Sequence, residues 1–142
     1  MSLIRRNRPA ALALGVVLGL AVGGGAAFAA VDAGKVVASR IDGFKKMGAA
    51  FKGLNDGLKA DAPDVKALQA NAKTVNQYAK QVGKWFPAGT GPSSGVKTRA
   101  KAEIWSQAGD FKAAADGFVA GTAKFSGVVA GGNVDTIKAD LK

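Results

Sequence analysis

The chain has 142 residues, and its 20 lysines and arginines against 10 acidic residues give a formal charge of +10 at pH 7. It contains no cysteine and no histidine. These absences exclude disulfides, thiolate zinc sites, thioether-linked cofactors, Ser-His-Asp triads and imidazole metal ligands. The acidic residues are dispersed, with no two placed as an acid–base pair. We therefore predict one domain without catalytic residues or metal ligands, which is not an enzyme.

The first 29 residues have the pattern of a secretory signal peptide. Three arginines open the chain, an apolar run follows over 10–22, and Ala-Phe-Ala at 27–29 supplies a small-x-small cleavage site. A transmembrane anchor is the alternative, but three glycines end the run short of the ~20 apolar residues that span a bilayer. We predict cleavage of 1–29, export to the periplasm, a mature domain of 30–142, and no transmembrane anchor after cleavage.

Apolar residues after this leader recur at alternating spacings of three and four, which is typical of amphipathic helices. Three stripes follow this spacing, over 37–58, 65–85 and 104–129, and a short fourth stripe covers 134–141. Nothing alternates with period two, so no strands are expected. Long helices that each carry one apolar stripe predict an all-α, up-down antiparallel four-helix bundle with an incomplete fourth helix.

Turn and capping residues separate the stripes. The stretch Asp61–Asp64 supplies a cap, a proline in the first turn and an acid that the helix dipole favours. The stretch 86–95 is the one long punctuated loop, Gly131-Gly132 ends the third stripe, and Asn133 caps the fourth. That last segment spans only about 15 Å against roughly 35 Å for the others. We interpret it as an interrupted helix, with a naturally short capping helix as the alternative.

Four stretches carry a resemblance to a known family. They read RIDGFKKMG at 40–48, WFPAGTGP at 85–92, TRAKAEIW at 98–105 and GNVDTIK at 132–138. Together they resemble the cytochrome c′ family of exported four-helix-bundle haem proteins, and the match covers the whole mature chain. The resemblance implies haem-dependent electron transfer or binding of a diatomic gas such as nitric oxide.

The family attaches haem c through a Cys-x-x-Cys-His motif that follows on the fourth helix, and this sequence lacks it. Haem iron needs an axial His, Cys, Met or Tyr. Only Met47 and Tyr78 on the predicted stripes are of these types, and neither replaces the missing histidine. We expect a truncated member of the family that is unable to attach haem, with attachment cysteines and axial histidine both absent.

The resemblance also assigns four cofactor-binding residues. Phe44 and Met47 correspond to the residues that crowd the open iron face, Arg40 to a position near a haem propionate, and Phe86 to a wall of the pocket. For Phe44, Met47 and Phe86 the alternative is ordinary bundle core, since apolar stripes usually reflect packing. For Arg40 the alternative is a solvated helix residue.

Lysines recur every seven residues on the side predicted to face away from the apolar stripes: Lys45, Lys52, Lys59, Lys66, Lys73 and Lys80. They form either a solvated face or a docking stripe for an acidic redox partner. Nucleic acid is not expected, because the aromatic residues beside the loop also fit the end of the bundle. The family resemblance implies a homodimer through the first helix. The alternative function is a cofactor-free helical binding or scaffold protein that completes its core with a partner or by dimerising.

Overall fold

The computed structural model describes residues 31–141, and every regular element among them is helical. The predicted signal segment lies outside the described residues. The elements are α1 Ala33–Lys59, α2 Val65–Val82, the 3₁₀ turn η1 Pro92–Ser94, α3 Glu103–Ser106, α4 Ala108–Ala130 and α5 Val134–Asp140. The predicted all-α class is confirmed. Within the described part of the chain, no helix combines the length and apolarity needed to cross a membrane.

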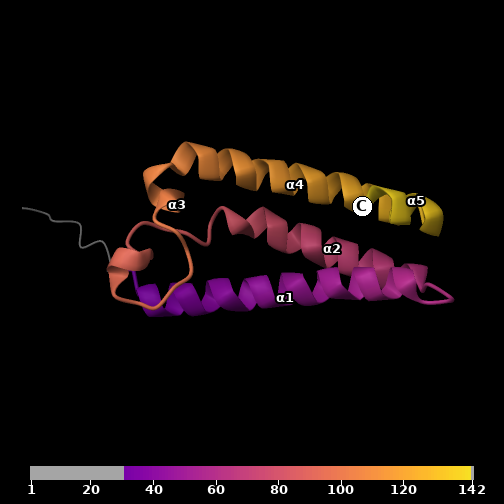
Figure 1. The fold of residues 1–142 in the computed structure, drawn as a ribbon, viewed down its shortest axis with the longest axis horizontal. Helices are drawn as coiled ribbons and strands as arrows, with labels where there is room; N and C mark the ends of the chain where they lie inside the picture. The colour runs from indigo at the N-terminus through magenta and orange to yellow at the C-terminus, as the bar shows by residue number, and fades with distance from the viewer. Residues whose placement is uncertain (1–30, 142) are drawn as a thin grey trace, which may run out of the picture.

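The long helices form an antiparallel bundle in which α2 packs against both α1 and α4 (Figure 1). The short α5 folds back on the end of α4, where Lys124 Nζ lies 3.4 Å from Asp140 Oδ1. This is the predicted bundle with a short last helix. Because α5 covers only one end, a groove stays open between α1 and α4, lined by residues 44–54 of α1 and 117–125 of α4.

Side-chain caps start three of the helices. Asp32 accepts a hydrogen bond from Lys35 N at 3.0 Å, Asp64 from Lys66 N at 2.9 Å and Ala67 N at 3.2 Å, and Asn133 from Thr136 N at 2.9 Å. Each cap satisfies backbone N–H groups that have no partner inside the helix. The predicted Asn133 cap is confirmed. Pro63 precedes α2 instead of lying in its first turn, because Asp64 is the capping residue.

Two predicted stripes end or break where tertiary contacts intervene. The stripe over 65–85 is helical only to Val82, and Trp85 follows in a turn. The stripe over 104–129 is divided at Gln107, whose φ of −120° and ψ of 51° separate α3 from α4. The Trp105 indole Nε1 donates a 3.0 Å hydrogen bond to the carbonyl of Pro87, which ties α3 to the loop and sets it apart from α4.

The buried core lies at the end of the bundle where α1 turns into α2 and where α5 returns. Its members come from α1, α2, α4 and α5: Ala50, Leu54, Leu58, Leu68, Ala72, Val75, Val129 and Ile137. Each buried leucine, isoleucine or valine of this core contributes about 1.5–3 kcal/mol. Among residues 31–141, no second cluster of this size is buried between α1 and α4, and the candidate site begins at the edge of this core.

Candidate functional site

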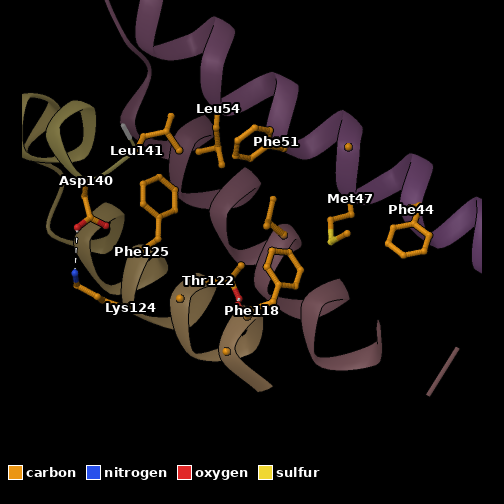
Figure 2. Close-up of a pocket in the computed structure, with 14 residues that line it drawn as sticks. Phe44, Met47, Phe51, Leu54, Phe118, Thr122, Lys124, Phe125, Asp140 and Leu141 are labelled. Carbon is orange, nitrogen blue, oxygen red and sulfur yellow. Dashed lines mark hydrogen bonds and ion pairs between the residues drawn. The ribbon is translucent and has the colours of Figure 1, made fainter. Parts of the chain in front are cut away.

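A groove of about 820 Å³ lies between α1 and α4 (Figure 2). Its walls are mainly apolar side chains: Phe44, Met47, Phe51, Leu54, Val75, Phe118, Phe125 and Leu141. Figure 2 shows Phe51, Leu54, Phe125 and Leu141 toward one end, and Phe44 and Met47 further along α1. This volume is within the range of about 300–1,000 Å³ in which proteins hold small molecules and cofactors.

Several residues that the apolar stripes placed in the core are open to solvent in this groove. Phe44 is 41% exposed, Phe51 48% and Phe118 40%. Met47 is half-buried and packs against the edge of the core. Ordinary core burial therefore does not describe Phe44. Exposed large apolar side chains gathered around one concavity mark a binding surface, because isolated monomers rarely leave such patches open.

Three glycines in the middle of α1 and α4 also line the groove: Gly48, Gly117 and Gly121. A Cβ at any of them would meet no atom within 4 Å. At Gly43, by contrast, a Cβ would come within 2.5 Å of the Trp85 ring, so packing explains that glycine. A helical glycine costs about 1 kcal/mol relative to alanine. Packing within the described residues gives no reason for the three groove glycines, which leave the helix backbones bare toward the groove.

A second cavity, of about 900 Å³, adjoins the groove at Phe44, which lines both. Its other lining residues come from α1, the loop after α2 and the start of α3: Arg40, Ile41, Lys45, Phe86, Lys97, Thr98, Arg99, Ala100, Lys101, Glu103 and Ile104. The structure thus brings the four predicted site residues to two adjoining cavities. Phe44 and Met47 line the groove, and Arg40, Phe44 and Phe86 line the second cavity.

Arg40 is buried, with 4% of its surface exposed, so its alternative interpretation as a solvated helix residue is wrong. Its Nε donates to the carbonyl of Trp85 at 2.9 Å, and its Nη2 donates to the carbonyl and the hydroxyl of Thr90 at 3.2 and 2.8 Å. Nη1 reaches the hydroxyl of Thr98 at 3.5 Å. The guanidinium carbon lies 4.2 Å from the centroid of the Phe86 ring, in cation–π geometry.

Every oxygen that Arg40 contacts is uncharged, and within residues 31–141 it takes part in no ion pair. Burial lowers the pKa of Arg40, because desolvation penalises the charged form. Arginine nevertheless keeps its charge at physiological pH. The wall of the second cavity therefore holds a fixed positive charge that no described carboxylate balances.

An aromatic cluster surrounds this arginine and fixes the loop against the bundle. The Phe44 ring meets Trp85 edge-on at 4.8 Å between centroids, and Phe86 meets Phe111 at 5.0 Å and Trp105 at 6.0 Å. Edge-to-face contacts of this kind contribute roughly 0.5–1.5 kcal/mol beyond the area they bury. Two members of the cluster line the cavities: Phe44 lines both of them, and Phe86 lines the second.

Sequence analysis did not single out Thr90 or Trp105 as site residues. Thr90 is completely buried and accepts from Arg40, and Trp105 lies with its ring centroid 5.7 Å from the Arg40 guanidinium carbon. The sequence feature that could have identified them is their position in two stretches that resemble the family, 85–92 and 98–105. The pairing itself joins distant parts of the sequence, which no local pattern reports.

The lining of the groove suits the apolar ring of a porphyrin, but it offers little to ligate haem iron. Its bare glycine backbone and aromatic walls leave room for a flat ring. Among its lining residues only Met47 is of a type that ligates haem iron, since Tyr78 does not line it. The sequence has no cysteine for a thioether and no histidine for the iron. The residues therefore fit the ring, and they do not fit its covalent attachment or imidazole ligation.

Comparisons with known proteins agree with this geometry. The family model described as Cytochrome C′ matches residues 35–142. The crystal structure of cytochrome c′ from Rubrivivax gelatinosus is similar, with a TM-score of 0.68 and 31% identity over 77% of this chain and 84% of that one. The crystal structure of cytochrome c′ from Thermochromatium tepidum has a TM-score of 0.68 and 20% identity over 78% and 85%, and shows a shared fold. No curated protein matches the chain.

Proposed function

The chain belongs to the cytochrome c′ family, and from this we propose that it is a periplasmic helical bundle whose groove between α1 and α4 receives a haem-sized group. Members of this family bind haem c, are typically periplasmic, and carry electrons or bind gases in place of enzyme catalysis. The corresponding role for this chain is haem-dependent electron transfer or binding of a diatomic gas such as nitric oxide. We further propose that these residues do not attach haem covalently.

The observation that carries the proposal is the open groove with bare backbone on two of its helices. Phe44 and Met47 on α1 and Phe118 on α4 line opposite sides of the groove, while Gly121 lets a ring approach the α4 backbone. These side chains would hold the ring by apolar contact and keep water from its faces. A bound haem would supply one-electron redox chemistry and a coordination position for a small gas.

The second part of the proposal rests on composition. Thioether attachment requires cysteine, and the strong axial ligand of the family is a histidine, whereas this sequence contains neither residue. The ring is then bound reversibly, through apolar contacts. Haem and metal-free protoporphyrin should bind with similar affinity, because the contacts are made to the ring and not to the iron.

A titration of the purified chain with haem and with metal-free protoporphyrin tests this, with visible absorbance and tryptophan quenching as readouts. A groove-filling Gly121→Leu variant should weaken both ligands about tenfold or more, since the added side chain occupies the ring's space. Gly127→Leu is the matched control, because Gly127 lies on the same helix, is exposed and does not line the groove. Binding that Gly121→Leu leaves unchanged, or no binding of either ligand, would contradict the proposal.

The exposed phenylalanines favour a second candidate function, a cofactor-free binding or scaffold protein. Phe51 and Phe118 leave an apolar face that another polypeptide or a second copy, docked through the first helix, would cover. The molar mass of the purified chain in solution tests this: the scaffold function requires an assembly that a Phe51→Lys, Phe118→Lys double variant dissociates. A monomer that binds porphyrin would favour the haem-site proposal.

An acidic redox partner also remains a proposal, supported by the exposure of all six heptad-spaced lysines. One of these lysines, Lys45, does not lie where the heptad spacing predicts. Lys45 was predicted to face away from the apolar stripes, but it lines the second cavity, because the loop after α2 folds over that part of α1. Exposed charges of this kind mainly raise association rates. Stopped-flow association with an acidic redox protein should slow as salt is raised if the lysines steer docking.

A further inference from the structure

We propose that the exposed face of α2 docks the protein onto an anionic phospholipid membrane, with the groove between α1 and α4 turned away from the lipid. The inference goes beyond the haem-sized site, since it requires neither a bound ring nor an occupied groove. It rests on three features of α2: a row of exposed lysines, the absence of acidic residues beside them in the sequence, and the position of the row opposite the groove.

The lysines of α2 form a straight row. Lys66, Lys73 and Lys80 recur every seven residues, which is close to two helical turns, so they lie on one face of the helix. Lys84 follows them in the turn after the helix, and all four are exposed. The other exposed residues of α2 are alanines and glutamines. At ~1.5 Å per residue, the row from Lys66 to Lys80 is about 21 Å long.

The charge of this row is not balanced within the described residues. The sequence holds seven cationic residues and no acidic residue over 65–102. Across residues 31–141, the four lysines of the row take part in no ion pair. By contrast, Lys46 pairs with Asp42 on α1, and Lys112 pairs with Asp116 on α4. The face of α2 therefore keeps a positive charge that an anionic surface would attract.

The row lies on the side of α2 that faces away from the groove. Val75 is the α2 residue that lines the groove, and it is buried where α2 packs against α1 and α4 (Figure 1). At 3.6 residues per turn, Val75 points about 160° away from Lys73 and about 140° away from Lys80. No lysine of the row lines either cavity. A surface that holds the row therefore leaves the groove open to solvent.

These features favour a lipid surface over an acidic protein. Protein interfaces are depleted in lysine and depend on aromatic or arginine anchors, which the exposed residues of α2 do not include. An electron-transfer partner would also need to dock beside the groove, where a redox group would lie, and the row lies on the opposite side. Anionic headgroups form a continuous plane that a straight row can follow. Each lysine near such a plane strengthens binding by about fivefold.

Flotation with vesicles tests the proposal on the chain purified after export, so that the predicted leader 1–29 does not add its own affinity for lipid. At low salt, phosphatidylcholine vesicles with about 30% phosphatidylglycerol should bind the chain, and pure phosphatidylcholine vesicles should not. Sodium chloride at about 0.5 M should release it, because salt screens exposed charges. A Lys66→Gln, Lys73→Gln, Lys80→Gln triple variant should bind the anionic vesicles about tenfold more weakly, or weaker still.

Two control variants keep the result specific. The Lys97→Gln, Lys101→Gln, Lys138→Gln variant removes the same charge from exposed positions outside α2, so it should weaken binding less than about twofold. The Phe51→Gln, Phe118→Gln variant should bind as the parent chain does, since the groove stays out of the lipid.

None of these measurements involves porphyrin, so their outcome does not depend on the haem-site proposal. Failure to bind anionic vesicles, equal losses in the two lysine variants, or a loss in the phenylalanine variant would overturn the membrane proposal. Binding to an acidic redox protein that needs the α2 lysines, without binding to vesicles, would overturn it as well and assign the row to a protein partner.

Discussion

Arg40 and Thr90 form a buried polar pair that joins the first helix to the loop after the second. Arg40 Nη2 donates to Thr90 Oγ1 at 2.8 Å, and that hydroxyl in turn donates to the carbonyl of Pro87 at 2.8 Å. Thr90 exposes none of its surface. The pair fixes the loop that forms one wall of the second cavity, so the shape of that cavity depends on it.

Replacing Arg40 with lysine should lower the free energy of unfolding by about 2–4 kcal/mol, even though the charge is kept. An ammonium group cannot reproduce the planar set of bonds to Trp85 and Thr90 or the stacking on Phe86. Urea unfolding measures the change. Arg99→Lys is the control, since Arg99 is exposed and its replacement should be neutral. Equal stability of the two variants would show that Arg40 does not hold the loop.

Thr90→Val should cost about 1–3 kcal/mol, because it keeps the shape of the side chain and leaves buried polar partners unsatisfied. Thr98→Val removes only the 3.5 Å contact with Arg40 and a local bond to the backbone of Ala100, so its effect should be smaller. Thermal unfolding of the two variants, measured side by side, shows which one loses more stability. The reverse order would mean that the loop is held through Thr98 instead.

Replacing a groove glycine with alanine should raise stability, whereas the same change at a glycine packed against another side chain should lower it. Gly48→Ala and Gly117→Ala should each raise stability by about 0.5–1 kcal/mol, because alanine favours the helix and nothing lies within reach of the new methyl group. Gly43→Ala should be destabilising, since its Cβ would come 2.5 Å from the Trp85 ring. Denaturant midpoints test all three, and a loss of stability at Gly48 or Gly117 would show unseen packing against them.

Ile137 should be the residue that anchors α5 to the bundle. It is completely buried and belongs to the same core as Leu54 and Leu68. Ile137→Ala should cost about 2–5 kcal/mol, in the range of buried aliphatic truncations. Hydrogen exchange should then show faster exchange over α5 than over α2. Lys138→Ala, on an exposed position of the same helix, should leave both unchanged.

The three long helices could be predicted because their signals are local. The apolar spacing along them depends only on near neighbours in the sequence, and so does the cap Asn133 of the short α5. Asp64 was expected as an acid in the first turn of α2, and it is the cap of that helix. The break at Gln107 could not be predicted, because the apolar stripe continues through it while its cause, the bond from Trp105 to Pro87, is tertiary.

The same distinction holds at the candidate site. An apolar stripe indicates that Phe44 and Phe51 lie on one helix face, but not whether another element covers that face. Both remain partly open in the groove. The burial of Arg40 depends on Trp85 and Thr90, which are distant in the sequence. Only the resemblance placed Arg40 at the site, and local pattern left it as a surface residue.

The central claim is that this bundle has a groove for a porphyrin ring and lacks the groups that bond haem to the chain. Intact-mass spectrometry under denaturing conditions tests this claim most directly. The chain would be purified from a host that matures c-type cytochromes and is supplied with haem. We predict the mass of the polypeptide alone, with any haem absorbance lost on denaturation. A species heavier by one haem would contradict the account.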